Sequence, residues 1–496
     1  MNDDVRLFSH VRPPGWRNPD PAPTYDLVVI GGGTAGLVCA AGAAGLGARV
    51  ALVERARLGG DCLNTGCVPS KSLLRSARAL SELRTARRLG VIAEGKADFG
   101  SIMARLRARR ADLAPHDSAA RLTSLGVDVF FGKASFSGPR TVTVERNDPN
   151  DPNGPNDRVL RFRKAVIATG SRPAVPSIAG LGETPFLTTE TVFDLTEQPR
   201  ELVVIGAGPS GCELAQAFAR LGTRVTLIEA ASQILPREDA DAARLLAARL
   251  TEDGVEIRLQ ASFTAARWAD GRFELDHDGR TTSADAVVVT TGRAVSVDGL
   301  GLDAAGVAHG PDGVTVDDRL RTSNARVYAA GDVCSPHKFT HTADAMAHVV
   351  VQNALFVGRR RVSSLVMPSC TFTSPEVAHV GLHANDAVAQ GADTITIPLT
   401  AVDRAVMDEA TDGLVRVHHR RGRILGATIV APEAGEIIGA VVLAMQHRLG
   451  LADLASAIFP YPTISMALRQ AGDEYRRRSL TPSVRSLLRY YFKGFR

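Results

Sequence analysis

The sequence is poor in cysteine and in long apolar runs, and each shortage excludes a class of protein. Six cysteines in 496 residues cannot form the dense disulfide network of a small secreted scaffold, so we expect a reducing compartment, the cytoplasm. Residues 1–23 contain no apolar run and do not resemble a secretory signal. No stretch of the chain is long and apolar enough to span a bilayer.

A large excess of charge is missing as well. The net charge is only +5, and no nucleic-acid-binding module is recognisable, so we expect no nucleic-acid partner. The hydrophobic fraction of 45% is ordinary for a globular protein and is sufficient for sizeable cores. A chain of this length is expected to contain about two to four domains.

One stretch, Gly59 to Lys71 (GGDCLNTGCVPSK), combines two cysteines with a turn and a helix start. Cys62 and Cys67 have four residues between them, a spacing that differs from the C-x2-C of zinc sites. Pro69 suits the first turn of a helix, and the segment from Ser72 to Leu89 is rich in Leu, Ala and Arg. Cys67 should then lie near a helix N-terminus, where the helix dipole favours a thiolate. The alternative is two small core residues, but the polar turn between them favours a redox pair.

A nucleotide-binding motif precedes the cysteines. The run Asp26 to Ile30 (DLVVI) predicts a buried strand, and a G-x-G-x-x-G turn at Gly31, Gly33 and Gly36 leads into an Ala-rich helix. These glycines permit a tight turn and close approach of a pyrophosphate to the helix N-terminus. Glu54 ends the second strand, where a carboxylate can accept hydrogen bonds from ribose hydroxyls.

The same unit returns 175 positions later. Glu201 to Ile205 (ELVVI) predicts the strand, Gly206, Gly208 and Gly211 form the turn, and Glu229 has the spacing of Glu54. Two such sites predict two dinucleotides, and their arrangement around a dithiol suggests an electron path.

Glu229 also bears on the choice of nicotinamide. A carboxylate at this position repels a 2′-phosphate, so we expect NADH to be favoured over NADPH. Arg224 and Arg237 are the nearest basic residues, and either could weaken that preference.

On these residues the chain resembles the flavin-dependent pyridine nucleotide–disulfide oxidoreductases, in the mercuric reductase and dihydrolipoyl dehydrogenase branch, from about Tyr25 to about Gly472. The resemblance implies an α/β protein with two Rossmann-like domains, for FAD and NAD(P), and a C-terminal α+β dimerisation domain. The expected segments are an irregular, Pro-rich leader (1–24) attached through Trp16, an FAD-binding domain (25–172 and 295–365), an NAD(P)-binding domain (173–294), a dimerisation domain (366–475) and a basic aromatic tail (476–496).

The resemblance also assigns roles to the residues around the cysteines. Cys67 would face the flavin, and Cys62 would exchange with the substrate. Lys71 would pair with Glu213 beside the flavin, the alternative being that Glu213 is an exposed helix residue. Where some relatives have a tyrosine that gates the nicotinamide pocket, this chain has Pro209.

Further motifs complete the resemblance to the flavin domain. The segments 165–170 and 287–293 look like the crossovers between the two nucleotide domains, and 327–332 looks like the second flavin motif. The residues implied in cofactor binding there are Thr169, Gly170, Gly292, Asp332, which would bind the ribityl chain, and His341, near the start of the following helix. Cys334, His337 and His341 have irregular spacing, so we predict no structural metal. The polar tract Asn147 to Asp157 predicts a mobile loop between two strands.

The last domain departs from the family pattern at two positions. From about Met367 short strands are followed by helices, expected near 434–449 and 464–471. Relatives place a histidine and a glutamate over the partner's disulfide as acid and base, but this chain has Tyr461 and Met466. A thioether carries no proton and an ordinary phenol is a poor base, so disulfide turnover is not expected. Tyrosine occurs there in mercuric reductases, although no cysteine follows Cys370 here.

After Glu474 the chain has no acidic residue and is rich in Arg, Lys and aromatic residues. This tail predicts either a segment lying on an anionic membrane surface or a terminal helix packed on its own dimer.

Together these features predict a homodimeric enzyme that passes electrons from NAD(P)H through FAD and the Cys62–Cys67 disulfide to a thiol-avid acceptor such as Hg(II). The two cysteines would be transient ligands of that ion. One alternative is a dihydrolipoyl-dehydrogenase-like enzyme acting on a small disulfide. Another is a flavoprotein that mainly binds a membrane or a partner.

Overall fold

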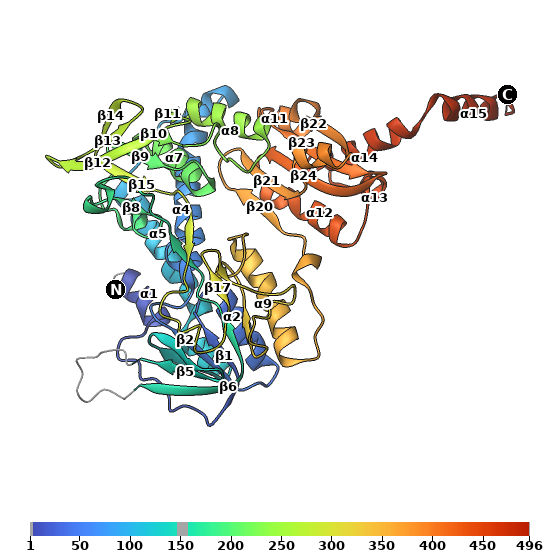
Figure 1. Cartoon of the computed structure of the whole chain (residues 1–496). Helices are drawn as coiled ribbons and strands as arrows, with labels where there is room; N and C mark the ends of the chain where they lie inside the picture. The colour runs from blue at the N-terminus through green and yellow to red at the C-terminus, as the bar shows by residue number, and fades with distance from the viewer. Residues whose placement is uncertain (1–2, 146–156, 496) are drawn as a thin grey trace. The chain divides into compact units, whose positions relative to one another are not determined.

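The computed structural model describes residues 3–145 and 157–495, and Figure 1 labels its helices and strands. The chain divides into two compact units. Unit 1 comprises Met1–Ile205, Leu221–Thr223 and Phe263–Leu365, and unit 2 comprises Gly206–Arg220, Arg224–Ser262 and Val366–Arg496. The predicted tract Asn147 to Asp157 joins β5 and β6 in unit 1, and its residues up to 156 lie outside the described ones.

A seven-stranded sheet organises unit 1. Its order is β3-β2-β1-β6-β5-β4, with β19 also paired to β6. The strands β1, β2, β3, β6 and β19 run parallel, whereas β5 is antiparallel to both of its neighbours, β6 and β4. Their bounds are β1 Tyr25–Ile30, β2 Val50–Glu54, β3 Val127–Phe131, β4 Ala134–Gly138, β5 Thr141–Val144, β6 Arg158–Ile167 and β19 Val327–Ala329. The segment 165–170 was predicted as a short strand ending in a turn: its residues 165–167 are the end of the long β6, and residues 168–170 follow that strand.

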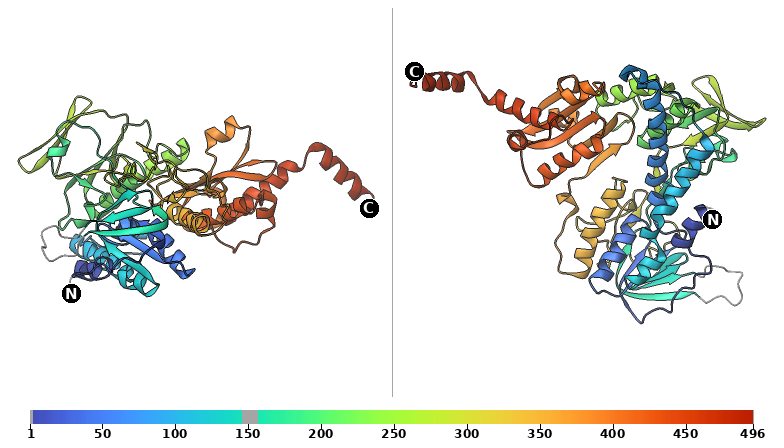
Figure 2. Two further views of the ribbon diagram at one scale, coloured as in Figure 1. Left: turned by 60° about the horizontal axis from the view of Figure 1, so that its bottom comes forward. Right: turned by 180° about the vertical axis from the view of Figure 1, so that it is seen from behind.

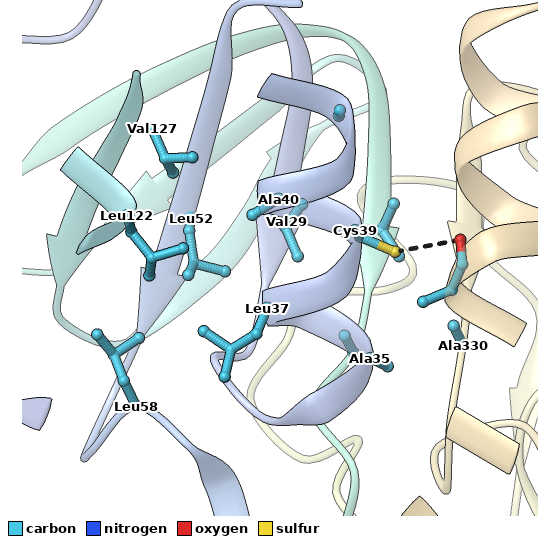
Figure 3. Close-up of a cluster of buried hydrophobic side chains, with 14 of the residues drawn as sticks. Val29, Ala35, Leu37, Cys39, Ala40, Leu52, Leu58, Leu122, Val127 and Ala330 are labelled. Atoms are coloured by element: carbon cyan, nitrogen blue, oxygen red, sulfur yellow. Dashed lines mark hydrogen bonds between the residues drawn. The ribbon is translucent and has the colours of Figure 1, made fainter. Parts of the chain in front are cut away.

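Helix α2 (Thr34–Gly45) packs between this sheet and α9 (Thr340–Leu355). Figure 3 shows the apolar side chains of α2 beside those of the strands, including Leu37 and Leu52, both of which are buried. On the other side of α2, the Cys39 thiol donates to the Ala347 carbonyl oxygen of α9 at 3.8 Å. A parallel sheet is covered on both faces, and for this reason its strands are almost entirely apolar in sequence.

The cysteine stretch forms two helices, α3 (Gly60–Asn64) and α4 (Cys67–Thr85). Helix α4 begins five residues before the predicted Ser72, and residues 86–89 continue it as a 3-10 turn. It lies beside α5 (Phe99–Leu113), and the two run next to each other in Figure 2. The Asp98 side chain caps α5 by accepting from the Ser101 amide at 3.2 Å.

The prediction of an irregular leader was wrong for its first part, because Asp3–Val11 forms helix α1. Leu7 and Val11, four residues apart, bury their side chains on one face. The prediction for Trp16 is confirmed. Its indole nitrogen donates to the Val129 carbonyl oxygen at 3.2 Å, and its ring meets Phe131 edge-on at 5.7 Å.

The rest of unit 1 consists of short strands and one small helix. A three-stranded antiparallel sheet is formed by β12, β13 and β14, and β15 pairs in parallel with both β8 and β9. The bounds are α6 Ala119–Ser124, β7 Ser171–Pro173, β8 Leu187–Thr188, β9 Glu201–Ile205, β12 Phe263–Ala269, β13 Arg272–His277, β14 Arg280–Ala284, β15 Ala286–Val289, β16 Arg293–Val295, β17 His309–Gly310 and β18 Gly313–Val314.

Unit 2 begins with the second glycine turn and ends with an α+β domain, as predicted. The domain has a five-stranded antiparallel sheet of order β20-β21-β24-β23-β22, with an apolar core beneath its helices. The bounds are α7 Pro209–Leu221, β10 Arg224–Ile228, α8 Ala240–Glu252, β11 Val255–Arg258, β20 Pro368–Thr371, β21 Glu376–Gly381, α10 Ala384–Ala389, β22 Asp393–Pro398, α11 Asp403–Met407, β23 Leu414–Arg420, β24 Arg423–Ala431, α12 Ala434–Gln446, α13 Leu451–Ser456, α14 Met466–Ser479 and α15 Pro482–Lys493.

Among the residues with described positions, no helix combines the length and the apolar character that crossing a membrane requires.

Candidate active site

The two cysteines of the predicted redox pair lie on consecutive helices of unit 1. Cys67 is the first residue of the 19-residue helix α4, and Cys62 lies within α3. The Cys67 sulfur is 3.4 Å from the hydroxyl of Thr340, which is the first residue of α9. The thiol therefore lies at the amino ends of two long helices, whose dipoles both favour a negative charge on sulfur.

The two sulfurs differ in their surroundings. The two cysteines are not joined by a disulfide; Cys67 is exposed and Cys62 is partly buried. A hydrogen bond with Cys67, together with burial, raises the pKa of the Cys62 thiol above its ordinary value. Cys62 is thus the sulfur that keeps its proton in the reduced pair.

Two arginines hold the short helix that carries Cys62. Arg293 donates from Nη2 to the carboxylate of Asp61, the residue before Cys62. The buried Arg110 donates from Nη1 to the carbonyl oxygen of Asn64, the last residue of α3, at 2.9 Å. Neither arginine was predicted as a site residue. Arg293 follows Gly292 in a motif that the sequence did indicate, whereas nothing near Arg110 marks it.

Arg293 also joins the cysteine stretch to the second flavin motif. Its Nε donates to the Ser171 hydroxyl at 2.6 Å and lies 3.5 Å from Asp332 Oδ2. The Ser171 hydroxyl in turn donates to Asp332 Oδ2 at 2.5 Å. A single network of polar contacts in unit 1 therefore connects four residues that are far apart in the sequence: Asp61, Ser171, Arg293 and Asp332.

The two glycine turns are built alike, down to their hydrogen bonds. Gly31 and Gly206 have φ angles of +106° and +100°, which favour glycine. Glu54 accepts from the amide of Gly32 at 2.7 Å, and Glu229 accepts from Ala207, the equivalent amide, at 2.6 Å. The other oxygen of Glu54, Oε1, accepts from the Ala56 amide at 2.6 Å. Oε1 of Glu229 likewise accepts from the Ala231 amide at 2.9 Å.

These turns fit the pyrophosphate and ribose of a dinucleotide. A Cβ on Gly208 would meet no described atom within 4 Å, and one on Gly33 would meet only the Cα of Gly60, at 3.6 Å. A Cβ on Gly36 would lie 1.8 Å from the carbonyl oxygen of Gly31, so helix and turn require glycine there. Gly211 is buried in the first turn of α7. Each carboxylate oxygen has a second lone pair, which remains available to a ribose hydroxyl.

The other predicted cofactor residues lie at strand ends and at the start of α9. The Thr169 hydroxyl donates to the Ser296 carbonyl oxygen at 2.7 Å, and the Ser296 amide returns a bond to Gly170 at 3.0 Å. Gly292 has a φ angle of +143°. His341 is the second residue of α9, as predicted, and its exposed ring stacks on Phe339 at 5.4 Å.

Lys71 and Glu213 lie on α4 and α7. Lys71 follows Cys67 by four residues, so the two side chains are on the same face of α4. Glu213 is 5% exposed, which excludes the alternative of an exposed helix residue, and its Oε1 accepts from the Phe372 amide at 2.9 Å. Their pairing stays a prediction.

Tyr461 lies in unit 2 and is 67% exposed. Its hydroxyl donates to Asp403 Oδ2 at 3.0 Å, and this hydrogen bond raises the pKa of the Tyr461 phenol. The Tyr461 phenol therefore stays protonated and does not act as a base. Asp403 was missed because it lies 58 positions away and no motif surrounds it. Met466 begins α14.

The family described as "Pyridine nucleotide-disulphide oxidoreductase" matches residues 25–349, and its "dimerisation domain" matches residues 367–471. Together these matches cover both nucleotide motifs, the cysteine pair and the C-terminal α+β domain.

Individual relatives cover nearly the whole chain. A mercuric reductase of Staphylococcus aureus is 34% identical over 458 residues, covering 90% of this chain and 82% of the relative. A dihydrolipoyl dehydrogenase of Chlamydia muridarum is 32% identical, covering 89% and 94%. Among solved structures, the Cu(II) complex of the HOCl-induced flavoprotein disulfide reductase RclA from Escherichia coli has a TM-score of 0.81 at 29% identity, covering 91% of this chain and 99% of RclA.

Proposed function

Since the chain belongs to the pyridine nucleotide-disulphide oxidoreductase family, we propose that it reduces a thiol-avid metal ion, Hg(II) or a related ion, at the Cys62–Cys67 pair. The family is FAD-dependent and uses a pyridine nucleotide, so the chain is an FAD-dependent oxidoreductase. The names of the relatives support a metal-ion acceptor: six of the similar proteins are mercuric reductases, and RclA was solved as a Cu(II) complex.

The observation that carries the proposal is the position of Cys67. Its sulfur lies at the N-terminus of α4 and 3.4 Å from the Thr340 hydroxyl at the N-terminus of α9. Such a thiol ionises readily, and a thiolate is both a nucleophile and a soft-metal ligand. The neighbouring Cys62 is protonated in the absence of the ion. It releases its proton when it binds the ion, so the two sulfurs together form a two-thiolate site.

In the overall reaction one NADH and one Hg(II) give NAD⁺, a proton and Hg(0), so two electrons are transferred. When bound, FAD and the nicotinamide supply the hydride transfer, and the glycine turns with Glu54 and Glu229 would hold them. The residues of this chain then have three tasks. Cys62 and Cys67 bind the ion, Arg293 and Arg110 fix the helix that carries Cys62, and Tyr461 presents a phenol whose proton is held by Asp403.

Tyr461 and Met466 support a metal ion over a small disulfide as acceptor. Reduction of a disulfide requires a group that gives a proton to the departing thiolate, and the raised pKa of Tyr461 makes it a weak acid. Reduction of a bound metal ion has no such leaving group. By the family resemblance, Tyr461 would act on the partner's cysteines in a cytoplasmic homodimer, which the matched dimerisation domain supports.

Glu229 supports NADH as the electron donor. Both of its oxygens are held by backbone amides, so the carboxylate cannot swing away from a 2′-phosphate. We expect kcat/KM for NADH to exceed that for NADPH, and Glu229→Ala should reduce the difference.

The test is NADH oxidation by the purified flavoprotein with Hg(II) under excess thiol, with Cu(II) as a second ion. We expect saturable, ion-dependent turnover that yields volatile Hg(0). Turnover with lipoamide but not with Hg(II) would favour the dihydrolipoyl dehydrogenase function instead. Anaerobic titration with NADH should also produce a long-wavelength absorbance band from Cys67 thiolate at two-electron reduction, and bleaching without this band would refute the role of the cysteines.

A further inference from the structure

A group of three metal-binding side chains lies in unit 2, in segments that contain neither the cysteines nor the glycine turns. Glu238 precedes α8, His379 lies in β21, and His383 is the residue just before the first residue of α10. One ligand atom of each lies within 4.8 Å of the ligand atoms of the other two. Within the ranges 3–145 and 157–495 this is the one such group of His, Cys, Asp and Glu side chains.

Two atoms of the group are buried without a hydrogen-bond partner in the described structure: Glu238 Oε2 and His383 Nδ1. His383 Nδ1 forms an ion pair with Asp239 Oδ1 at 3.6 Å, a distance beyond hydrogen-bond length. Leaving such polar atoms unsatisfied destabilises the folded state, so their convergence requires an explanation.

His379 adds a third acceptor. Its Nε2 lies 3.0 Å from the Gly381 carbonyl oxygen, which only accepts, so Nε2 carries the proton of the neutral ring. Its Nδ1 is then an acceptor, 3.0 Å from the Thr428 hydroxyl. That hydroxyl also lies 2.9 Å from Asp239 Oδ2 and has one hydrogen for two acceptors. The group thus has more lone pairs than the surrounding hydrogens can satisfy.

We propose that Glu238, His379 and His383 bind a divalent transition-metal ion of borderline softness, with Zn(II) as the representative ion. Two imidazoles and one carboxylate form a donor set that zinc accepts while keeping a position for water. Imidazole ligands disfavour Mg(II) and Ca(II), which prefer oxygen. The bond from His379 to the Gly381 carbonyl is the outer contact that orients a ligating histidine.

Binding requires a local rearrangement. The two imidazoles are stacked, with centroids 3.5 Å apart and planes 5° from parallel, so their lone pairs cannot converge on one ion as they stand. His379 is fixed by two contacts and is 6% exposed, whereas the His383 side chain is 29% exposed. His383 is therefore the ring that turns, and it brings the ligand atoms to the spacing of about 3.4 Å that tetrahedral zinc requires.

A bound ion would join the segment before α8 to the connection between β21 and α10. Asp239 already joins them, since it accepts from the amide of Ala384, the first residue of α10, at 2.8 Å; it also accepts from Arg416 of β23 at 3.1 Å. The ion would act in the same place, as an additional cross-link, and we expect it to raise the thermal midpoint of unfolding.

The test uses the full flavoprotein with Cys62→Ser and Cys67→Ser, so that the redox pair cannot bind the added metal. After chelator treatment, calorimetric titration with ZnCl2 should show one ion per chain and a rise in the thermal midpoint. Glu238→Gln and His383→Ala in that background should weaken binding more than about tenfold, and His447→Ala, an exposed histidine elsewhere in unit 2, should not.

Co(II) distinguishes this site from the remaining cysteines. The expected result is visible d–d absorption without thiolate-to-cobalt charge transfer, lost in Glu238→Gln and His383→Ala. Flavin content and the metal-free midpoint of each variant show that it is folded. Absence of saturable zinc binding, a thiolate signature, or equal affinity in His383→Ala, Glu238→Gln and His447→Ala would overturn the proposal.

Discussion

The proposed chemistry depends on two protons. One is on the Cys62 thiol and the other is on the Tyr461 phenol. Cys62 holds its proton because Cys67 and burial disfavour a second thiolate beside the first. Tyr461 holds its proton because Asp403 accepts a hydrogen bond from it. The first proton leaves when a metal ion binds, whereas the second stays in place, so the two residues should give different pH profiles.

Cys62→Ala should retain its flavin and lose metal-dependent NADH oxidation by more than about 10³-fold, because a single thiolate cannot form the two-sulfur site. The measurement is steady-state turnover together with flavin absorbance. Cys370→Ala, which removes a partly buried cysteine outside the pair, is the matched control and should turn over normally. Turnover that survived in Cys62→Ala would mean that electrons leave without the cysteine pair.

Asp403→Asn should lower the pKa of Tyr461 toward its ordinary value, because the negative acceptor that opposes ionisation is removed. If activity needs the phenol proton, the alkaline limb of kcat/KM shifts to lower pH in Asp403→Asn. Tyr461→Phe has no such limb and should lose about ten- to a hundredfold in kcat/KM. The tyrosinate absorbance of the wild type minus that of Tyr461→Phe measures the pKa directly. An unchanged limb in Asp403→Asn would refute the role of this pair.

At the residue scale, the sequence could predict only those site residues that lie in local motifs. The cysteines, glycines and acidic residues have fixed spacings, and the structure gives Glu54 and Glu229 the same hydrogen bonds. Asp403, Arg110 and Glu238 have no such spacing, because their partners are brought to them only by the tertiary fold. A single acidic or basic residue far from any motif gives no local signal.

Among the elements, helix starts were predicted better than short helices. The start of α9 at Thr340 was expected from the strand and turn before it, and α4 begins at Cys67, within the predicted turn. Helix α1 was missed because a Pro-rich segment follows it and its nine residues have only two buried positions, Leu7 and Val11. So short an amphipathic pattern is stabilised by packing and not by propensity.

Leu7→Ala tests whether α1 belongs to the core of unit 1. Leu7 is 1% exposed, so truncation should cost about 2–4 kcal/mol. Val5→Ala on the same helix, at a residue 50% exposed, should change stability by less than about 0.5 kcal/mol. The measurement is the first transition in thermal or urea unfolding, with flavin release as a second signal. Equal midpoints for the two variants would show that α1 is dispensable.

For the whole molecule, the repeated nucleotide unit was sufficient to predict the α/β class, and the short strands followed by helices after about Met367 predicted the C-terminal α+β domain. The basic, aromatic tail was predicted to be either a segment on an anionic membrane surface or a terminal helix packed on its own dimer, and the structure shows helix α15 with no buried residue. Membrane contact of this tail stays a prediction. The domain boundaries also stay predictions.

The homodimer can be tested by complementation. Co-expression of Cys62→Ala and Tyr461→Phe chains should restore about a quarter of wild-type activity, because half of the random dimers contain one intact site of two. This result requires that Tyr461 serve the cysteines of the other subunit. Activity no higher than that of either variant alone would mean that each chain uses its own Tyr461, or that the chain is a monomer.

Helix α1 has a practical consequence for attaching the protein to an electrode or a resin. Asp4 on α1 accepts from Arg110, and Arg110 donates to the last residue of the helix that carries Cys62. A tether that pulls on the amino end would therefore transmit force to α3, the helix that carries Cys62, through these two hydrogen bonds. A tether beyond α15, none of whose residues is buried, would leave these contacts alone. An immobilised sensor based on this enzyme should be anchored at its carboxyl end.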